Sequence, residues 1–160
     1  MWGVNSDGDI WYRHGLFADW ELIPGNLKQI TVGHMGVFGI DSDEVVYYRK
    51  GTHKNPTSAG SDWQEIAGKL SYISSGRNAV LGVNSRSEIF SMENVAFTKD
   101  HLLCTWDARP GDLKQISICG GNFLLFNSCI ILPVFLTCVD QFIDKILTQP
   151  TYTCEKVGER

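Results

Sequence analysis

Residues 20–30 read Trp-Glu-Leu-Ile-Pro-Gly-Asn-Leu-Lys-Gln-Ile, and the chain returns to this pattern twice. Residues 63–73 read Trp-Gln-Glu-Ile-Ala-Gly-Lys-Leu-Ser-Tyr-Ile, and residues 106–116 read Trp-Asp-Ala-Arg-Pro-Gly-Asp-Leu-Lys-Gln-Ile. Trp, Gly, Leu and Ile each recur at steps of 43 residues. A fixed period of roughly 20–50 residues is the sequence signature of a repeat architecture, in which each copy is one small structural unit.

A second motif precedes these stretches. It reads Trp-Gly-Val-Asn-Ser at 2–6, Phe-Gly-Ile-Asp-Ser at 38–42 and Leu-Gly-Val-Asn-Ser at 81–85. The Asn-Ser and Asp-Ser steps are typical of turns, and the runs that follow them are rich in β-branched and aromatic residues, which favour strands. The segment at 29–32 alternates polar and apolar residues, which is the two-residue period of a strand.

One unit therefore predicts four short strands, the size of a propeller blade, and a blade must pack against its neighbours to bury a core. We predict an all-β fold, a partial β-propeller of about three four-stranded blades over residues 1–121. The units fall at about 2–36, 37–79 and 80–121. Residues 122–160 share none of the repeat and are predicted to form an apolar tail that is irregular or contains a short helix.

Net charge, cysteine spacing and the first residues argue against several classes of function. The 160 residues carry a net charge of −4, so the chain lacks the basic footprint of a nucleic-acid-binding protein. None of the five cysteines falls in a CxxC motif, which argues against a zinc or redox site. The first residues have neither a basic nor an apolar leader, so we expect no signal peptide in this chain.

The combined pattern Trp-Gly-Val-Asn-Ser, then Ile-x-Tyr-Arg, then Trp-x-x-Ile-Pro-Gly-x-Leu-Lys-Gln-Ile resembles the tectonin repeat. It is most similar to the fish-egg lectins and their tachylectin-like relatives, over residues 2 to about 121. The resemblance implies a propeller of about five or six blades and a secreted, extracellular lectin of innate immunity. It also implies carbohydrate binding, with galactose- or N-acetylglucosamine-type sugars and bacterial lipopolysaccharide as partners, and it allows calcium as a cofactor.

The tail departs from this family pattern after residue 121, so half of a propeller would be missing. Phe123 to Val139 contains no formal charge, but it is shorter than the roughly 20 apolar residues of a spanning helix. A membrane anchor is therefore not favoured. A cap over the open blade flank is a second interpretation. A third, which we favour, is unselected sequence introduced by read-through or alternative splicing. Open flanks would also permit self-association.

Sugar binding needs an aromatic face for the ring and planar or charged partners for its hydroxyls. Two recurring groups offer these features, the Tyr-Arg pairs and the acidic turns that precede them. The alternative is that Tyr packs between blades and Arg bridges neighbouring carbonyls. The three recurring tryptophans are predicted to be core. The candidate carbohydrate-binding residues are Asn5, Asp7, Tyr12, Arg13, Asp41, Asp43, Tyr48 and Arg49.

No catalytic or metal constellation is predicted. Residues 5–9 begin like a calcium loop, but Ile10 and Leu16 stand where an EF-hand needs Gly and Glu. His101 and Cys104 lack an orienting acid, so they do not form a nucleophile with its base. We therefore expect a non-catalytic lectin, or a fragment of one. The alternative is a tectonin propeller that serves as a scaffold for protein or membrane binding without binding sugar.

Overall fold

The computed structural model describes residues 1–98, 101–119 and 122–125, and every regular element in them is a strand. No helix in these residues is long and apolar enough to cross a bilayer. The strands, in chain order, are β1 (Trp2–Val4), β2 (Asp9–Tyr12), β3 (Glu21–Asn26), β4 (Gln29–Gly33), β5 (Gly36–Ile40), β6 (Val45–Arg49), β7 (Trp63–Lys69), β8 (Tyr72–Ser75), β9 (Val80–Val83), β10 (Glu88–Phe97), β11 (Leu102–Asp112), β12 (Ile116–Cys119) and β13 (Asn122–Leu125).

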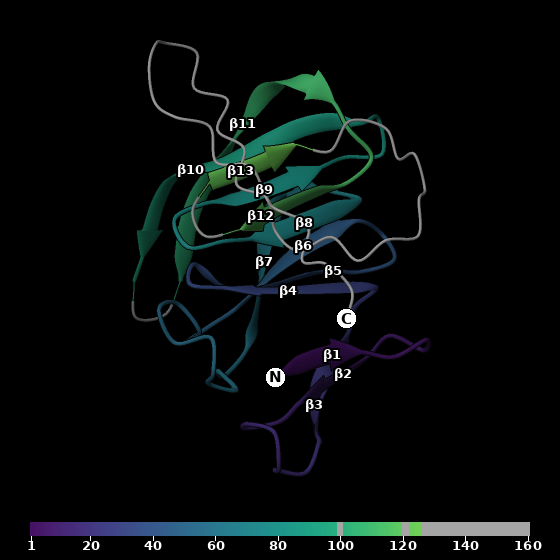
Figure 1. The fold of residues 1–160 in the computed structure, drawn as a ribbon, viewed down its shortest axis with the longest axis vertical. Helices are drawn as coiled ribbons and strands as arrows, with labels where there is room; N and C mark the ends of the chain where they lie inside the picture. The colour runs from purple at the N-terminus through teal and green to yellow at the C-terminus, as the bar shows by residue number, and fades with distance from the viewer. Residues whose placement is uncertain (99–100, 120–121, 126–160) are drawn as a thin grey trace, which may run out of the picture.

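The strands form successive antiparallel sheets. The first sheet holds β1–β3, the second β4–β7 and the third β8–β11, and β12 and β13 form a final pair. Figure 1 shows them stacked one after another, with the first sheet at one end. The leading strands contact one another, β4 against β8 and β8 against β12. The prediction of an all-β, partial propeller is confirmed.

The boundaries between sheets differ from those between the predicted repeat units. The last strand of each predicted unit is the first strand of the next sheet. The strand that starts at Gln29 pairs with β5, placing Gln29 opposite Ile40, and it belongs to the second sheet. Residues 27–28 therefore cross from one sheet to the next. Leu27 N donates to Gly8 O on the first sheet, whereas Lys28 N donates to Ile40 O on the second.

A leucine packed over a glycine fixes each crossing. A Cβ added to Gly39 would lie 2.3 Å from Leu27 Cδ1, and one added to Gly82 would lie 2.2 Å from Leu70 Cδ1. No real Cβ approaches a carbon so closely, so only glycine admits the leucine at these two places. The recurring glycine of one motif and the recurring leucine of the other therefore form one contact, made by Gly39 with Leu27 and by Gly82 with Leu70.

The apolar core lies between the sheets. One cluster joins the first and second sheets, and the largest joins the second and third through fully buried side chains such as Phe38, Val46 and Ile73. Burying an aliphatic or aromatic side chain contributes about 1.5–3 kcal/mol, so these clusters hold the stack together. A smaller cluster, which includes Ile89, Leu113 and Ile116, joins the third sheet to β12.

Two glutamine side chains each make two hydrogen bonds to the backbone of one residue in the following sheet. We call such a pair of bonds a clamp. Gln29 Nε2 donates to Ile73 O at 2.8 Å, and its Oε1 accepts from Ile73 N at 3.1 Å. Gln64 makes the same pair of bonds to Leu102, at 2.8 and 2.7 Å. Because these bonds satisfy backbone groups near sheet interfaces, they fix the register of one sheet against the next.

β13 continues the strand order beyond the last recognisable repeat. Its residues pair with β12 as β5 pairs with β4, so Ile116 lies opposite Leu125. The predicted irregular or helical structure of the tail at 126–160 lies outside the described residues.

Candidate functional site

Three equivalent turns each carry an Asn or Asp side chain that accepts two backbone N–H groups. In the third sheet, Asn84 Oδ1 accepts from Arg86 N at 3.0 Å and from Glu88 N at 2.9 Å. Asp41 and Asn5 accept the corresponding two N–H groups in the second and first sheets. Each side chain therefore closes its own turn, as Asn and Asp commonly do.

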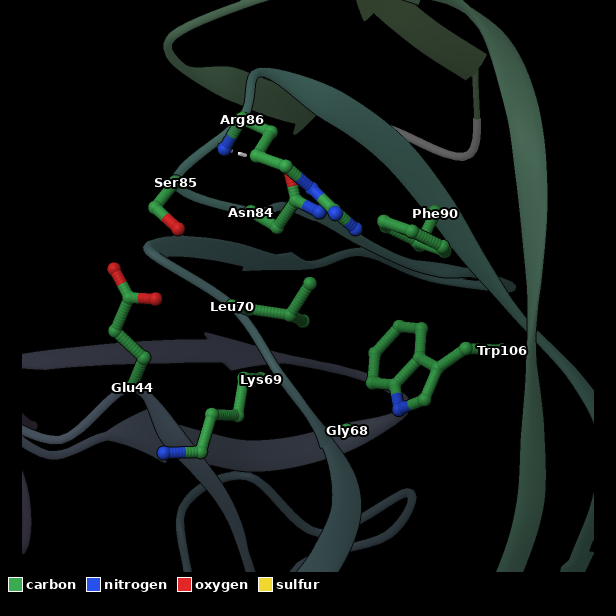
Figure 2. A pocket seen from close by; sticks show the side chains of 9 residues that line it. All are labelled: Glu44, Gly68, Lys69, Leu70, Asn84, Ser85, Arg86, Phe90 and Trp106. Atoms are coloured by element: carbon green, nitrogen blue, oxygen red, sulfur yellow. Dashed lines mark hydrogen bonds between the residues drawn. The ribbon is translucent and has the colours of Figure 1, made fainter.

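A groove opens between the second and third sheets at this end of the strands. Its volume is about 480 Å³, within the range of roughly 300–1,000 Å³ typical of small-molecule sites. Figure 2 shows Trp106 and Phe90 on one side, Glu44 and Lys69 across from them, and Leu70 between. The lining residues are Glu44, Gly68, Lys69, Leu70, Asn84, Ser85, Arg86, Phe90 and Trp106.

The groove combines an apolar wall with charged groups at its mouth. Trp106 and Phe90 are half-buried, and Arg86 and Lys69 are exposed. Trp106 Nε1 donates to Ala67 O at 2.8 Å, which fixes the indole between the sheets. Lys69 Nζ donates to Asp43 O at 3.2 Å. The arrangement offers an aromatic face with hydrogen-bond donors around it.

Glu88 stabilises the turn that carries Arg86. Asn84 Nδ2 donates to Glu88 Oε2 at 2.6 Å, and the Arg86 guanidinium pairs with the same carboxylate. The Asn84 bond is the main cause of the lowered pKa of Glu88, and the positive charge of Arg86 adds to it. The carboxylate therefore stays ionised and holds the turn in one shape at neutral pH.

The structure separates the two groups of residues that sequence reasoning combined. The acidic turns precede β2 and β6, whereas the Tyr-Arg pairs stand at the opposite ends of these strands. Asp41 and Asp43 occupy the repeat positions of Asn84 and Arg86, so they lie at the corresponding place between the first and second sheets. Asn5 and Asp7 hold the same positions in the first sheet.

The Tyr-Arg pairs are largely structural in their contacts. Tyr12 is buried, and its hydroxyl donates to Thr57 O at 2.6 Å; Tyr48 is also buried. Arg49 is 5% exposed, donates from Nε to Ala59 O, and lies over the ring of Trp63. Burial lowers the pKa of Arg49. Arg13 is less enclosed and lies over the ring of Trp20 at 4.8 Å.

Sequence reasoning missed the residues that line the groove from both sheets. The sequence predicts Trp106 as a core residue and does not single out Glu44, Lys69 or Arg86. The available signal was the repeat itself, because Arg86 stands one period after Asp43. The contact between Lys69 and the turn at Asp43 joins distant parts of the chain, so no local sequence pattern predicts it.

The described residues contain no group of three or more His, Cys, Asp or Glu side chains that could hold a metal ion. Cys104 is half-buried, and burial raises the pKa of its thiol. The backbone N–H of His101 donates to Thr98 Oγ1, which ties it into the β10–β11 hairpin.

Comparison with known proteins agrees with the repeat. The family model described as the Tectonin domain matches residues 1–126. A search of curated proteins found no match.

Proposed function

Because the chain belongs to the tectonin domain family, we propose that it is a non-catalytic carbohydrate-binding protein that holds a sugar in the groove between its second and third sheets. The sugar class is that of galactose, N-acetylglucosamine or bacterial lipopolysaccharide. The observation that carries the proposal is the meeting of a half-buried aromatic wall, Trp106 and Phe90, with the exposed donors of Arg86 and Lys69.

The chemistry of a pyranose suits such a groove. Its C–H face packs on an aromatic ring, while its hydroxyls take hydrogen bonds at the rim. Arg86 presents a planar guanidinium, and Glu44 supplies an acceptor on the opposite side. The turn at Asn84 is already fixed by its own hydrogen bonds, so little conformational entropy is lost when a ligand binds.

A single open groove of this kind binds weakly. The equivalent turn at Asp41 and Asp43 gives the preceding interface a related but more acidic lining, with Tyr47 in place of Phe90. Burial is the main cause of the raised pKa of Tyr47, and the charge of Asp41 adds to it, so its hydroxyl stays protonated and donates to Asp41 Oδ2 at 3.3 Å. Several such sites would together bind a repetitive bacterial surface more tightly than one.

The proposal is tested by retention on immobilised N-acetylglucosamine and galactose, with elution by the free sugar. Arg86→Ala should reduce the affinity by about tenfold, because it removes charge-assisted hydrogen bonds at the rim. Arg77→Ala is the matched control, since Arg77 is also exposed but lies in the turn at the other end of β9.

Retention of the unchanged protein with loss in Arg86→Ala, but not in Arg77→Ala, would support this groove as the site. Equal retention of both variants would place sugar binding elsewhere. Failure of the unchanged protein to bind either sugar or lipopolysaccharide would overturn the lectin proposal.

A further inference from the structure

We propose that two copies of this chain close into one ring, in which β12 of each copy becomes the leading strand of the other copy's first sheet. This inference does not depend on sugar binding. The first sheet has three strands, whereas the second and third have four. β1 corresponds in the repeat to β5 and β9, which pair with β4 and β8. Among the described residues, no strand pairs with the free edge of β1.

Among the described residues, no leucine covers the glycine of the first sheet. Over the second and third sheets, Leu27 and Leu70 lie so close to Gly39 and Gly82 that a Cβ would collide with them. Gly3 is the equivalent glycine of the first sheet, and a Cβ added there would meet no atom within 4 Å. The glycine is therefore present without the leucine that it accommodates elsewhere.

The segment that leads into β12 has the sequence to fill this place. Residues 113–116 read Leu-Lys-Gln-Ile, identical to residues 27–30 at the crossing into the second sheet. Leu113 N donates to Ser87 O at 3.0 Å, as Leu27 N donates to Gly8 O. Leu113 is thus held at the end of the third sheet in the position from which a leucine covers the next sheet's glycine.

The present partner of β12 lacks that glycine. β13 places Leu125 opposite Ile116, at the register position that Gly39 and Gly82 occupy in the complete sheets. Those two positions admit no Cβ beside their leucines, and β1 supplies Gly3 for the corresponding place next to Leu113. In the proposed ring, β1 of the second copy displaces β13 from the same edge of β12.

Polar side chains on β12 match backbone groups on the open flank, and Gln115 Nε2, which donates to the Tyr72 hydroxyl at 2.8 Å within one copy, would exchange that bond on association. Gln29 clamps the backbone of Ile73, and Thr31 Oγ1 accepts from Ser75 N. The equivalent side chains of β12 belong to Gln115 and Ser117, and both residues are exposed. Ile30 and Val32 stand one 43-residue period before the bonded residues Ile73 and Ser75, and Val32 is 43% exposed. Across the proposed interface, Gln115 and Ser117 of one copy would bond Ile30 and Val32 of the other.

The outer part of the interface repeats a contact already made twice within the chain. Trp63 and Trp106 each cover a glycine of the preceding sheet. Trp20 is their equivalent on the first sheet and is 44% exposed, with Leu22 beside it 59% exposed. The third sheet ends with the matching glycine, Gly111, above Ile89. Trp20 of one copy would therefore cover Gly111 of the other.

The proposed interface contains a charged cluster. Arg109 stands where the buried Ile23 and Ile66 stand in the other sheets, and it pairs with Glu93 and Asp107. The proposed interface is therefore less apolar than the two interfaces between sheets within the chain. Association should accordingly be weaker than the contacts within the chain.

The described sheets of two copies are enough for a closed ring. Propellers close with about four to eight blades, and three sheets from each of two copies would give six. The contact is head-to-tail, so it yields a ring if the rotation closes and open filaments if it does not.

The test is the mass of the full chain in reducing buffer, where no disulfide can link copies, by sedimentation velocity over a range of concentrations. We expect twice the 17.9 kDa chain mass. Gly3→Leu should give the single-chain mass with an unchanged far-ultraviolet circular dichroism spectrum, because a Cβ added at Gly3 meets no described atom within 4 Å in one copy, and the new side chain would occupy the place of Leu113 between copies.

Gln115→Ala provides a second, milder variant, which should raise the dissociation constant by about tenfold or more through loss of the backbone clamp. Its control is Lys114→Ala, at the neighbouring exposed residue, which should leave the constant unchanged. A single-chain mass for the unchanged protein at every concentration, a dimeric Gly3→Leu chain, or open-ended polymers would each overturn the proposal. If Gly3→Leu does not fold, the comparison of Gln115→Ala with Lys114→Ala decides.

Discussion

Trp106 donates from its indole Nε1 to the carbonyl oxygen of Ala67, on the preceding sheet, at 2.8 Å. Trp63 makes the same bond to Pro24, at 3.1 Å. In both cases the ring lies against a glycine that follows the acceptor, so the indole is in contact with backbone on one side. Each tryptophan thus joins two sheets by a polar bond and by packing together.

Trp106→Phe separates these two contributions. It keeps an aromatic ring but loses the donor, and Ala67 is exposed, so water can replace the bond. We expect a loss of about 1 kcal/mol in the free energy of unfolding. Trp106→Ala, which also removes a ring packed on the largest cluster, should cost about 2–4 kcal/mol. Urea denaturation measures both. Equal losses would show that the packing of the ring contributes nothing.

Gly82→Ala tests the contact between glycine and leucine. The new Cβ would lie 2.2 Å from Leu70 Cδ1, so the buried leucine must shift, at a cost of about 1–3 kcal/mol. Gly3→Ala is the matched control, because it occupies the equivalent position with nothing nearby. Thermal melts, at dilutions where the chain is monomeric, should leave the control unchanged. A control that loses as much stability as Gly82→Ala would contradict this account.

Gln64→Ala leaves two backbone groups of the buried Leu102 without their partner. An unsatisfied buried group costs about 1–3 kcal/mol, so we expect at least the upper part of that range. The neighbouring exposed Glu65 gives the control, since Glu65→Ala should change the free energy of unfolding by less than about 0.5 kcal/mol. A loss no greater than that of the control would mean that water replaces the clamp.

His53 makes stability depend on pH. It stacks on Phe97 with ring centroids 3.5 Å apart, and burial is the main cause of its lowered pKa. The folded chain therefore binds its proton less readily than the unfolded chain, whose pKa is about 6.5. Stability is complete above that value and falls as the pH drops through it toward the folded pKa.

His53→Phe, which keeps a ring against Phe97, should remove this part of the pH dependence. Melting temperatures measured between about pH 7.5 and pH 5 should decline in the unchanged protein and stay flatter in the variant, because the variant has no imidazole at this position to bind a proton. Parallel curves for the two proteins would show that His53 is not the responsible group.

The sequence predicted the strands well because the same residue types recur in three copies of the repeat. Trp, Gly, Leu and Ile recur at a fixed step, and that regularity outweighs the weak preference of any single residue. The grouping of strands into sheets was less accessible. The turn residues around Leu27 are compatible with a hairpin and with a crossing to a new sheet. The contact between Leu27 and Gly39 favours the crossing, and this contact is visible only in the structure.

The candidate site was only partly predictable, for a related reason. The turns at Asn5, Asp41 and Asn84 follow from Asn and Asp at repeated positions. The groove beside the third turn also needs Lys69 and Trp106, which come from strands of different sheets. Tyr48 stays a sugar-binding prediction, but a recurring aromatic residue in a repeat also packs neighbouring units, and this one is buried.

The clamps and the indole bonds all join one sheet to the next at nearly constant chain separation. An insertion or deletion of one residue within a strand would therefore break several contacts at once, whereas the addition of an entire 43-residue unit would renew every one of them. Genes for such chains are expected to change length by duplication or loss of whole units, with small length changes restricted to loops such as residues 13–19 and 50–62. The number of binding grooves would then change in whole steps over evolutionary time.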